Sequence, residues 1–312
     1  TGTRGDFFKP YLTIAAAITA ATADDVIVVY PGTYAESTDL SSKRLKYFLF
    51  KGTVLSGCYI GSANNLSIEG QGTILHNVSN ASFFRSPSYA KFFIQCDSIA
   101  CSEYLVGFTS GTLNSNFDFT LLANSFYAGF AWVSAYTNTI DTSRTYFYTI
   151  KVDNLYNGSS AFGGFIGGFP KRSLIVTANR TFYRAGRLQA NSVHNCNNSY
   201  ISVDYGELID DDGGVEQQYL FQNIGGNGIN RNRMFVDIRF RKWVNNNSFF
   251  YLYIDGTPGV DTLNKDAFFR VVCDECIYTG TKSQIWLTGT DDSTRMNGQV
   301  PIIIEGTFTA RS

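Results

Sequence analysis

The acidic side chains around position 210 are the residues whose types and spacing come closest to catalytic chemistry. Three consecutive aspartates precede a glycine pair and a glutamate follows it: Asp210, Asp211, Asp212 and Glu216. Glycoside hydrolysis needs two carboxyl groups at a defined separation, one of which its surroundings keep protonated. Consecutive aspartates before glycine are also typical of a solvated turn, or of a loop that holds a hard cation. The sequence favours the solvated turn, and a cation loop and a catalytic pair stay open as alternatives.

Aromatic residues with polar neighbours could bind a sugar, because a flat ring stacks on a sugar face while amides and carboxylates bond the hydroxyl groups. Trp243 lies just before three asparagines, Tyr219 follows two glutamines, and Tyr183 precedes an arginine. We add the cations Arg231 and Arg233 to this candidate glycan-binding set. For each of the rings, burial in a hydrophobic core is the alternative.

The cysteines and histidines do not form a metal-site pattern. Cys273-Asp274-Glu275-Cys276 is a lone C-x-x-C without a second pair or a nearby histidine. In an extended strand its two thiols would point to opposite faces. We therefore interpret them as partly buried thiols, and His76 and His194 as structural hydrogen-bonding residues rather than bases. The sequence predicts no metal and no cofactor.

Composition predicts a β-rich chain and gives no reason to expect nucleic acid or a membrane as a partner. Of the 312 residues, 15% are aromatic, 16% are charged and 29 are glycine. Aromatic enrichment with many turn-forming residues is typical of all-β proteins. A formal net charge of -1 gives no reason to expect nucleic acid or an anionic membrane as a partner. No apolar run reaches the roughly 18 residues of a membrane span, so we expect no membrane insertion.

Short apolar segments recur at intervals of roughly 20 to 35 residues, the period at which a solenoid is suspected. No consensus sequence repeats with them, as expected for a β-helix in which each coil needs only a few inward apolar positions. The predicted strand cores are 26–29, 47–50, 66–68, 92–95, 117–121, 146–152, 174–176, 200–205, 234–240, 249–254, 268–273, 285–288 and 301–305.

Residues 161–170 form an unusual segment of paired glycines and phenylalanines. The glycines let backbones approach closely, and the phenylalanines supply apolar area. We interpret the segment as a packed corner between coils, with an exposed contact to another subunit as the alternative.

The start of the chain predicts a helix followed by a strand. Residues 11–23 place Leu12, Ile14 and Ile18 on one apolar face at helical spacing, with alanines between them. A β-branched run, Val26–Val29, follows an acidic turn and ends at a Pro-Gly pair. Such a helix can cover the open end of a β-solenoid and protect its edge.

This opening resembles that of the pectin-lyase-like right-handed parallel β-helices. Their usual pattern is an aromatic residue, Thr-Ile, an alanine-rich helix, an acidic turn, a hydrophobic strand and Pro-Gly-x-Tyr-x-Glu; here it includes Thr13-Ile14 and ends at Glu36. The resemblance implies an all-β chain, a single-stranded right-handed parallel β-helix with an N-terminal capping α-helix. No coiled coil, charged tail or proline-rich linker divides the chain, which predicts one domain over 1–312. We expect the lead-in and capping helix in 1–25 and coils in 26–312, and the strand intervals predict longer loops after about residue 200.

Many members of this superfamily degrade acidic polysaccharides, but their catalytic motifs are missing here. The Arg-x-Pro-x-x-Arg motif of the lyases has Ala90 in place of its second arginine, after Arg85-Ser86-Pro87. The Gly-His-Gly element of the polygalacturonases is absent. An enzymatic role therefore loses support.

The chain is most similar to the β-helical tail spikes and tail fibres of bacteriophages, which implies a structural and host-attachment module. Such a module would bind a cell-surface polysaccharide, form a homotrimer and join other tail proteins, in the virion tail or outside the cell. The alternative is a polysaccharide lyase or glycoside hydrolase on the same β-helix, with Asp210, Asp211, Asp212 and Glu216 as its carboxylates.

Overall fold

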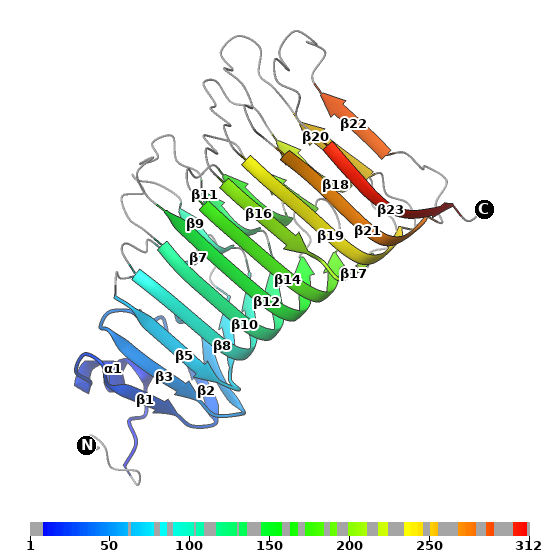
Figure 1. Ribbon diagram of the computed structural model, residues 1–312. Coiled ribbons are helices and arrows are strands. Elements are labelled where there is room, and N and C mark those ends of the chain that lie inside the picture. Colours follow the sequence, from blue (N-terminus) through cyan, green and yellow to red (C-terminus); the bar gives the residue numbers. More distant parts are fainter. Residues whose placement is uncertain are drawn as a thin grey trace.

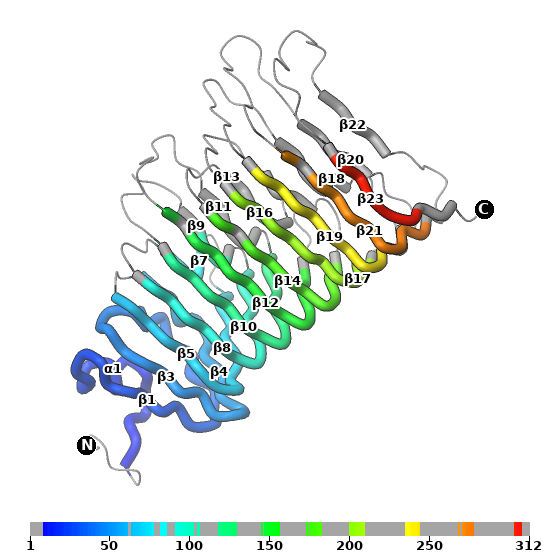
Figure 2. Tube along the Cα trace, in the orientation of Figure 1, coloured from blue at the N-terminus to red at the C-terminus, as the bar shows by residue number. Residues whose placement is uncertain are grey.

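The structure is a computed structural model in which one short helix precedes a long stack of parallel strands (Figure 1). The chain coils steadily from one end of an elongated body to the other, so that the first and last strands lie at opposite ends (Figure 2). The residues that the structure describes are 9–61, 64–77, 82–85, 90–102, 104–108, 117–129, 131–135, 145–157, 163–167, 172–183, 188–191, 199–210, 218–223, 234–245, 250–254, 268–278, 285–289 and 302–310.

The described strands form two sheets in which every pairing is parallel, so the chain is a mostly β parallel solenoid. The 15-stranded sheet wraps around a bend into two walls, and the 8-stranded sheet forms a third. In the 15-stranded sheet, β1, β3, β5 and β16 belong to the first wall, and β2, β4, β6 and β17 to the second. The long strands run through both walls.

The first-wall strands are β1 (Val26–Val29), β3 (Leu45–Leu49), β5 (Leu66–Gly70) and β16 (Ser199–Asp204). The second-wall strands are β2 (Gly32–Ala35), β4 (Thr53–Ser56), β6 (Thr73–His76) and β17 (Glu207–Asp210). The long strands are β8 (Ala90–Cys101), β10 (Phe117–Ala128), β12 (Tyr146–Asn157), β14 (Arg172–Tyr183), β19 (Met234–Asn245), β21 (Phe268–Tyr278) and β23 (Ile302–Ala310). The third wall contains β7 (Ser82–Phe84), β9 (Tyr104–Phe108), β11 (Ala131–Ala135), β13 (Gly163–Gly167), β15 (Leu188–Asn191), β18 (Gln218–Asn223), β20 (Phe250–Ile254) and β22 (Ile285–Gly289).

One inward position per coil builds the core of the first wall. The registers join Ile27, Tyr47, Ile68, Ile94, Leu121, Ile150, Val176, Val203, Ile238 and Val271 into one row, and all of these side chains are buried. The sequence intervals along this row lengthen after Val203, as predicted. Apolar side chains stacked rung on rung give the solenoid a continuous core, which is why no consensus sequence is needed.

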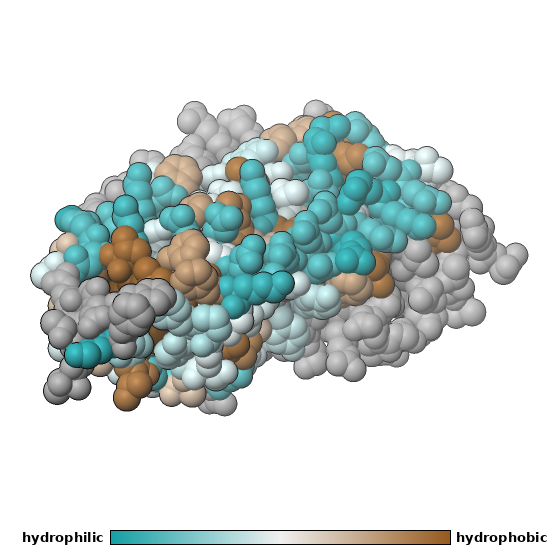
Figure 3. Space-filling model, turned by 90° about the horizontal axis from the view of Figure 1, so that it is seen from below, coloured by the Kyte–Doolittle hydropathy of each residue, from teal (hydrophilic) through white to brown (hydrophobic). Residues whose placement is uncertain are grey.

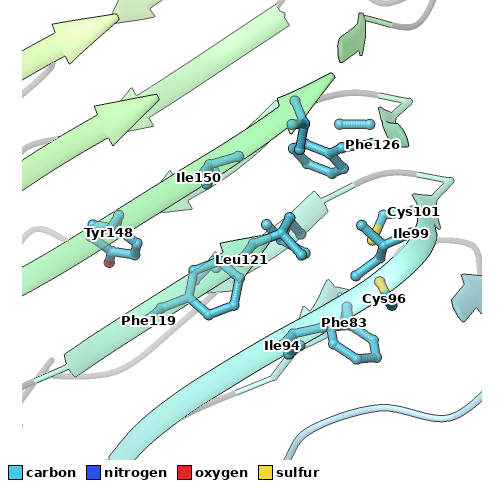
Figure 4. Packing of buried hydrophobic residues seen from close by; sticks show 14 of the residues in the cluster. Phe83, Ile94, Cys96, Ile99, Cys101, Phe119, Leu121, Phe126, Tyr148 and Ile150 are labelled. Carbon is cyan, nitrogen blue, oxygen red and sulfur yellow. The ribbon is translucent and has the colours of Figure 1, made fainter. Parts of the chain in front are cut away.

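Aromatic rings tie the third wall to the first inside the solenoid. Phe84 of β7 packs edge-on against Phe83, Phe92 and Phe119, with centroid distances of 5.1, 5.1 and 4.9 Å. Figure 4 shows side chains of this cluster projecting into the space between the walls. Such edge-to-face contacts add stability to the burial of the rings themselves.

The long strands bend where two successive residues point outward. In β12, Val152 and Leu155 are buried, whereas Asp153 is exposed and Asn154 is half-buried between them. The pairings of β12 with β10 and β14 pass from Val152 directly to Asn154. Because side chains of a regular strand alternate, the additional outward residue turns the rest of the strand onto the second wall.

Helix α1 spans Ile14–Ala20 and lies over the N-terminal end of the stack (Figure 1). The Glu36 carboxylate accepts hydrogen bonds from the first backbone N–H groups of the helix at 2.8 and 3.0 Å. At the other end, Nζ of Lys43 donates to three carbonyl oxygens at 2.7–2.9 Å. A negative charge at the N-terminus and a positive one at the C-terminus both favour the helix dipole, so these residues fasten the cap to the first coil.

The helix is shorter than the predicted 11–23. Ile14 and Ile18 are buried in the core, as the apolar spacing predicts. Leu12, however, is 91% exposed, because it precedes Thr13, whose side chain accepts from the N–H of Ala16 and begins the helix. The prediction that Leu12 belongs to the buried face is therefore wrong.

Of the glycine-rich segment 161–170, the structure describes Gly163–Gly167, which form β13. This strand pairs with β11 and β15 within the third wall. In these described residues the interpretation as a corner between coils is wrong, because Gly163, Gly164 and Phe165 lie in a parallel strand.

Candidate functional site

Most of the residues predicted to act lie outside the described side chains. Asp210 is the last residue of β17, and Tyr183 and Tyr219 lie in β14 and β18, but these three side chains are not among those described. Five more predicted residues lie outside the described ranges: Asp211, Asp212, Glu216, Arg231 and Arg233. Their roles stay predictions.

Trp243 lies inside the solenoid and not on its surface. Its side chain is 1% exposed, and its ring packs edge-on against Phe240 at a centroid distance of 5.6 Å. The bend of β19 sets Arg241 and Lys242 outward and turns the next residue into the core. The prediction that this ring stacks on a sugar is therefore wrong, because neither of its faces is open.

Both thiols of the C-x-x-C segment face the core, contrary to the expectation of opposite faces. Cys273 is 0% exposed and Cys276 8%, because the bend of β21 sets the two residues between them outward. A hydrogen bond with the Cys276 thiol and burial raise the pKa of Cys273 above its ordinary value. A thiol held protonated in this way is a poor nucleophile and a poor metal ligand.

His76 is buried in the second wall, where its Nδ1 lies 3.0 Å from the carbonyl oxygen of Cys58. Its ring also packs edge-on against Phe83. These contacts agree with a structural role. His194 lies outside the described residues.

An open hollow runs along the outside of the bend. Its volume is about 960 Å³, and exposed polar side chains from successive coils line it. We call it the bend groove and define it by Lys51, Gln71, Gln95, Asp97, Asn124, Lys151, Asp153 and Asn179. Seen from below, hydrophilic residues form a long band over the solenoid, interrupted by hydrophobic patches (Figure 3).

Side chains at the bend are fixed by hydrogen bonds from one coil to the next. Nδ2 of Asn124 donates to Oδ1 of Asp97, and Nδ2 of Asn179 donates to Oδ1 of Asp153, each at 2.7 Å. Nδ2 of Asn154 adds a longer bond to the carbonyl oxygen of Asn124 at 3.4 Å. These bonds lie where the backbone pairing skips a residue. The groove therefore presents carboxylate and amide oxygens in set positions, each with further capacity to accept hydrogen bonds.

The charges of the bend groove balance. Lys51 and Lys151 supply two positive charges, and Asp97 and Asp153 supply two negative ones. Both carboxylates are exposed. The groove suits a neutral ligand rich in hydroxyl groups better than a polyanion.

An outward row of aromatic rings crosses the first wall near the beginning of its long strands. Tyr200 stacks on Phe235 at 5.3 Å with an interplanar angle of 9°, and Phe235 stacks on Phe268 at 5.0 Å with an angle of 11°. The registers continue this row from Tyr200 to Ser173 and then to Phe147. One rung of the aromatic row thus carries a serine.

The serine rung places a small side chain between two exposed aromatic residues, and we call Phe147, Ser173 and Tyr200 together the aromatic slot. Phe147 is 48% and Tyr200 40% exposed. Since one face of Tyr200 covers Phe235, the other face points toward the serine rung. Two rungs at about 4.8 Å each separate the flanking residues by about 9.6 Å.

The bend residues were not predicted, although the sequence contains a signal for them. Polar pairs interrupt the alternating strands once per coil, as at Asp97-Ser98, Asn124-Ser125 and Asp153-Asn154. In a regular strand, one member of each pair would point into the core, where an unpaired polar group is costly. Recurrence of such pairs at the coil period indicates a bend with both side chains outside.

Two further kinds of site were sought in the described part of the chain. There, no three His, Cys, Asp or Glu side chains come together in a group that could hold a metal ion. Within the same residues, no helix has the length and apolar character needed to cross a membrane.

No protein-family model, curated protein or solved structure matches the chain.

Proposed function

We propose that the chain is a structural and host-attachment module that binds a cell-surface polysaccharide along the outside of its first wall. In this proposal it is of the tail-spike or tail-fibre type within the pectin-lyase-like β-helices, acts as a homotrimer with other tail proteins, and is located in the virion tail or outside the cell. The bend groove is the observation that carries the proposal.

Three properties of the bend groove support a glycan as its ligand. The groove is open and long, so it can accept part of a chain without enclosing an end. Its hydrogen-bonding groups are fixed by the contacts of Asn124 with Asp97 and of Asn179 with Asp153, which lowers the entropy lost on binding. Its balanced charges favour a neutral sugar segment over nucleic acid, whose phosphates require a basic surface.

Loss of two groove side chains should weaken this binding. We expect the double variant Gln95→Ala/Lys151→Ala to bind a recognised polysaccharide about tenfold more weakly, since each hydrogen bond lost costs about 0.5–1.5 kcal/mol. Both side chains are exposed, so folding should persist. Affinity is measured by biolayer interferometry against bacterial surface polysaccharides, with the second-wall variant Lys242→Ala as control. If the double variant and the control bound with equal affinity, the bend groove would not be part of the polysaccharide-binding surface.

Filling the aromatic slot tests whether a sugar ring stacks there. We expect Ser173→Phe to complete the row between Phe147 and Tyr200 and to reduce polysaccharide affinity about tenfold, because stacking of a ring on an aromatic side chain is worth about 1–3 kcal/mol by analogy with nucleobases. Thermal stability should stay equal or rise, since added aromatic pairs contribute about 0.5–1.5 kcal/mol. Ser173→Ala keeps the slot open and serves as control. Retained affinity in Ser173→Phe would show that the slot is not used.

The polysaccharide-cleaving alternative gains no support from the bend groove, whose two carboxylates are exposed. It stays a prediction that depends on Asp210, Asp211, Asp212 and Glu216. Replacement of these acids by alanine would abolish sugar release if the alternative held.

A further inference from the structure

Strand β1 (Val26–Val29) forms an open edge at the N-terminal end of the solenoid (Figure 1). It pairs with β3 on one side, and no described strand pairs with its other side. The carbonyl oxygens of Asp25 and Val29 accept hydrogen bonds from β3 at 3.0 and 3.1 Å. Because the bonding groups of successive residues point in alternate directions along a strand, the N–H and C=O groups of Val26 and Val28 point away from β3.

This edge lacks the usual protection of an edge strand. Natural edges are blunted by a charged residue, a proline, a bulge or a covering element. All four residues of β1 are β-branched and apolar. Helix α1 covers the end of the core with Ile14 and Ile18, but Val26 stays 57% and Val28 45% exposed. The edge is therefore in a form that accepts a further strand.

Exposed apolar side chains gather around the edge. Only four other large hydrophobic side chains of the described part are exposed, and they are spread over residues 127–303. In the next coil the outward position beside Phe48 is occupied by Glu69. A cluster of this kind, unlike single exposed apolar residues, is typical of a contact surface. We call it the tip patch, whose members are between 41% and 91% exposed: Leu12, Val26, Val28, Phe48 and Phe50.

On its inner side the edge adjoins an apolar hollow of about 800 Å³ between β1 and helix α1. Ala17 and Ala21 line the hollow on the helix side, and Ile27 and Val29 line it on the strand side. Side chains of a strand point alternately to opposite faces. A strand added to β1 would therefore direct every second side chain into the hollow and the others toward the tip patch.

An extended polypeptide segment matches the free edge, the tip patch and the hollow together. In β-strand addition, main-chain hydrogen bonds give affinity and pockets for alternate side chains give specificity. We infer that the open edge of β1 binds an extended, uncharged, apolar segment of another polypeptide, which joins the first wall as an additional strand. The bound segment pairs with the N–H and C=O groups of Val26 and Val28.

A second copy of this chain fits the edge less well, because its edge strands have no free inner face. In the β1 of a second copy, Ile27 is 9% and Val29 2% exposed, so both side chains are already in that copy's own core. Its β23 carries the exposed carboxylate of Glu305, which the apolar tip patch cannot pair. The partner segment must therefore be extended outside its own fold, as a linker or a chain terminus is.

The inference extends the proposed association with other tail proteins and rests on that proposal only for the class of protein that supplies the segment. It does not depend on polysaccharide binding, because the tip patch and the bend groove share no residue. The groove variant Gln95→Ala/Lys151→Ala should therefore bind a strand-forming peptide as the wild-type chain does. Failure of either proposal leaves the other standing.

Proline in place of Val28 tests the edge without disturbing the pairing with β3. The probe is a fluorescein-labelled peptide with lysine ends and Val-Ile-Val-Ile at its centre, and binding is followed by fluorescence anisotropy. Val28→Pro removes an N–H group that β3 does not use and should weaken binding about tenfold or more, because the ring also occupies the pairing position. Val28→Thr keeps the N–H group and the β-branched shape and should bind as the wild-type chain does.

A larger side chain in the hollow asks the same question from the helix side, so that the test does not depend on one variant. Ala17 lines the hollow, whereas Ala16 of the same helix is exposed and does not. Ala17→Phe should weaken peptide binding about tenfold, because the hollow then takes up less of the peptide's apolar surface. Ala16→Phe should leave binding unchanged. Circular dichroism melting verifies that each variant is folded.

Binding of the peptide by the wild-type chain, weakened in both Val28→Pro and Ala17→Phe, would support the inference. No binding by the wild-type chain, or equal binding by Val28→Pro and Val28→Thr, would overturn it. So would undiminished binding of a peptide N-methylated at every central residue, since such a peptide has no N–H groups for pairing.

Two further outcomes would assign the edge to another occupant and would also overturn the inference. Peptide binding that appears only after removal of residues 1–8 would assign the edge to the start of the chain itself. A wild-type mass above 34.6 kDa in light scattering that Val28→Pro lowers to this value would assign the edge to a second copy.

Discussion

Replacement of Trp243 by alanine should lower the free energy of unfolding by about 3–5 kcal/mol, as for other large aromatic residues removed from a core. The indole is 1% exposed, and its rung is stacked between those of Leu208 and Cys276 in the second wall. Truncation removes the contact with Phe240 and leaves a cavity that the neighbouring coils can close only in part. Urea unfolding followed by circular dichroism measures the loss.

Two controls separate burial of Trp243 from a role at the surface. Trp243→Phe keeps most of the apolar volume and should lose much less stability than Trp243→Ala. Tyr200→Ala removes a ring that is 40% exposed and should also cost less. If Trp243→Ala unfolded at the wild-type urea concentration but bound polysaccharide more weakly, the original expectation of an exposed ring would be right and the core placement wrong.

Gly206→Ala should destabilise the chain by about 3 kcal/mol or more, the range of severe core and backbone changes. Gly206 lies between β16 and β17 with φ of 61°, a left-handed conformation that costs other residues about 1–2 kcal/mol. A Cβ atom at this position would lie 2.1 Å from the carbonyl oxygen of Asn179 and 2.4 Å from that of Ala178. Because these are backbone atoms of the neighbouring coil, they cannot move aside without breaking parallel pairing.

Gly52→Ala supplies the matched comparison for Gly206→Ala. Gly52 also has a positive φ, 88°, but a Cβ atom there would meet nothing closer than 3.5 Å. Its replacement should therefore cost about 1 kcal/mol, from backbone strain alone. The difference between the two variants in urea unfolding isolates the clash between coils. Equal losses would show that the coil next to Gly206 yields easily, and would contradict the rigid stacking described here.

The sequence predicts the first wall of the fold better than the others. Val26–Val29 forms β1 as predicted, and the predicted core 117–121 lies within β10. Strands such as β6 (Thr73–His76) and β7 (Ser82–Phe84) were not predicted, because neither short segment has the uninterrupted β-branched run that identifies β1. Their conformation depends on pairing with neighbouring coils that are distant in sequence.

The bend explains why the site was predicted less well than the fold. Strict alternation places Cys273 and Cys276 on opposite faces, but two successive outward residues bring both into the core. The same bend buries Trp243 and exposes Asp97 and Asn124 to form the bend groove. A local pattern cannot reveal such a change of direction. The recurrence of a polar pair in the long strands β8, β10, β12, β14, β19 and β21 can reveal it.

The most direct test of the proposed function measures binding and cleavage on the same sample. Purified wild-type chain is incubated with bacterial surface polysaccharides, and both bound polysaccharide and newly formed reducing ends are measured. The account predicts that at least one polysaccharide binds without release of reducing ends, and that Gln95→Ala/Lys151→Ala weakens this binding. Binding that persists unchanged in that variant, release of oligosaccharides by the wild-type chain, or no binding to any polysaccharide would contradict it.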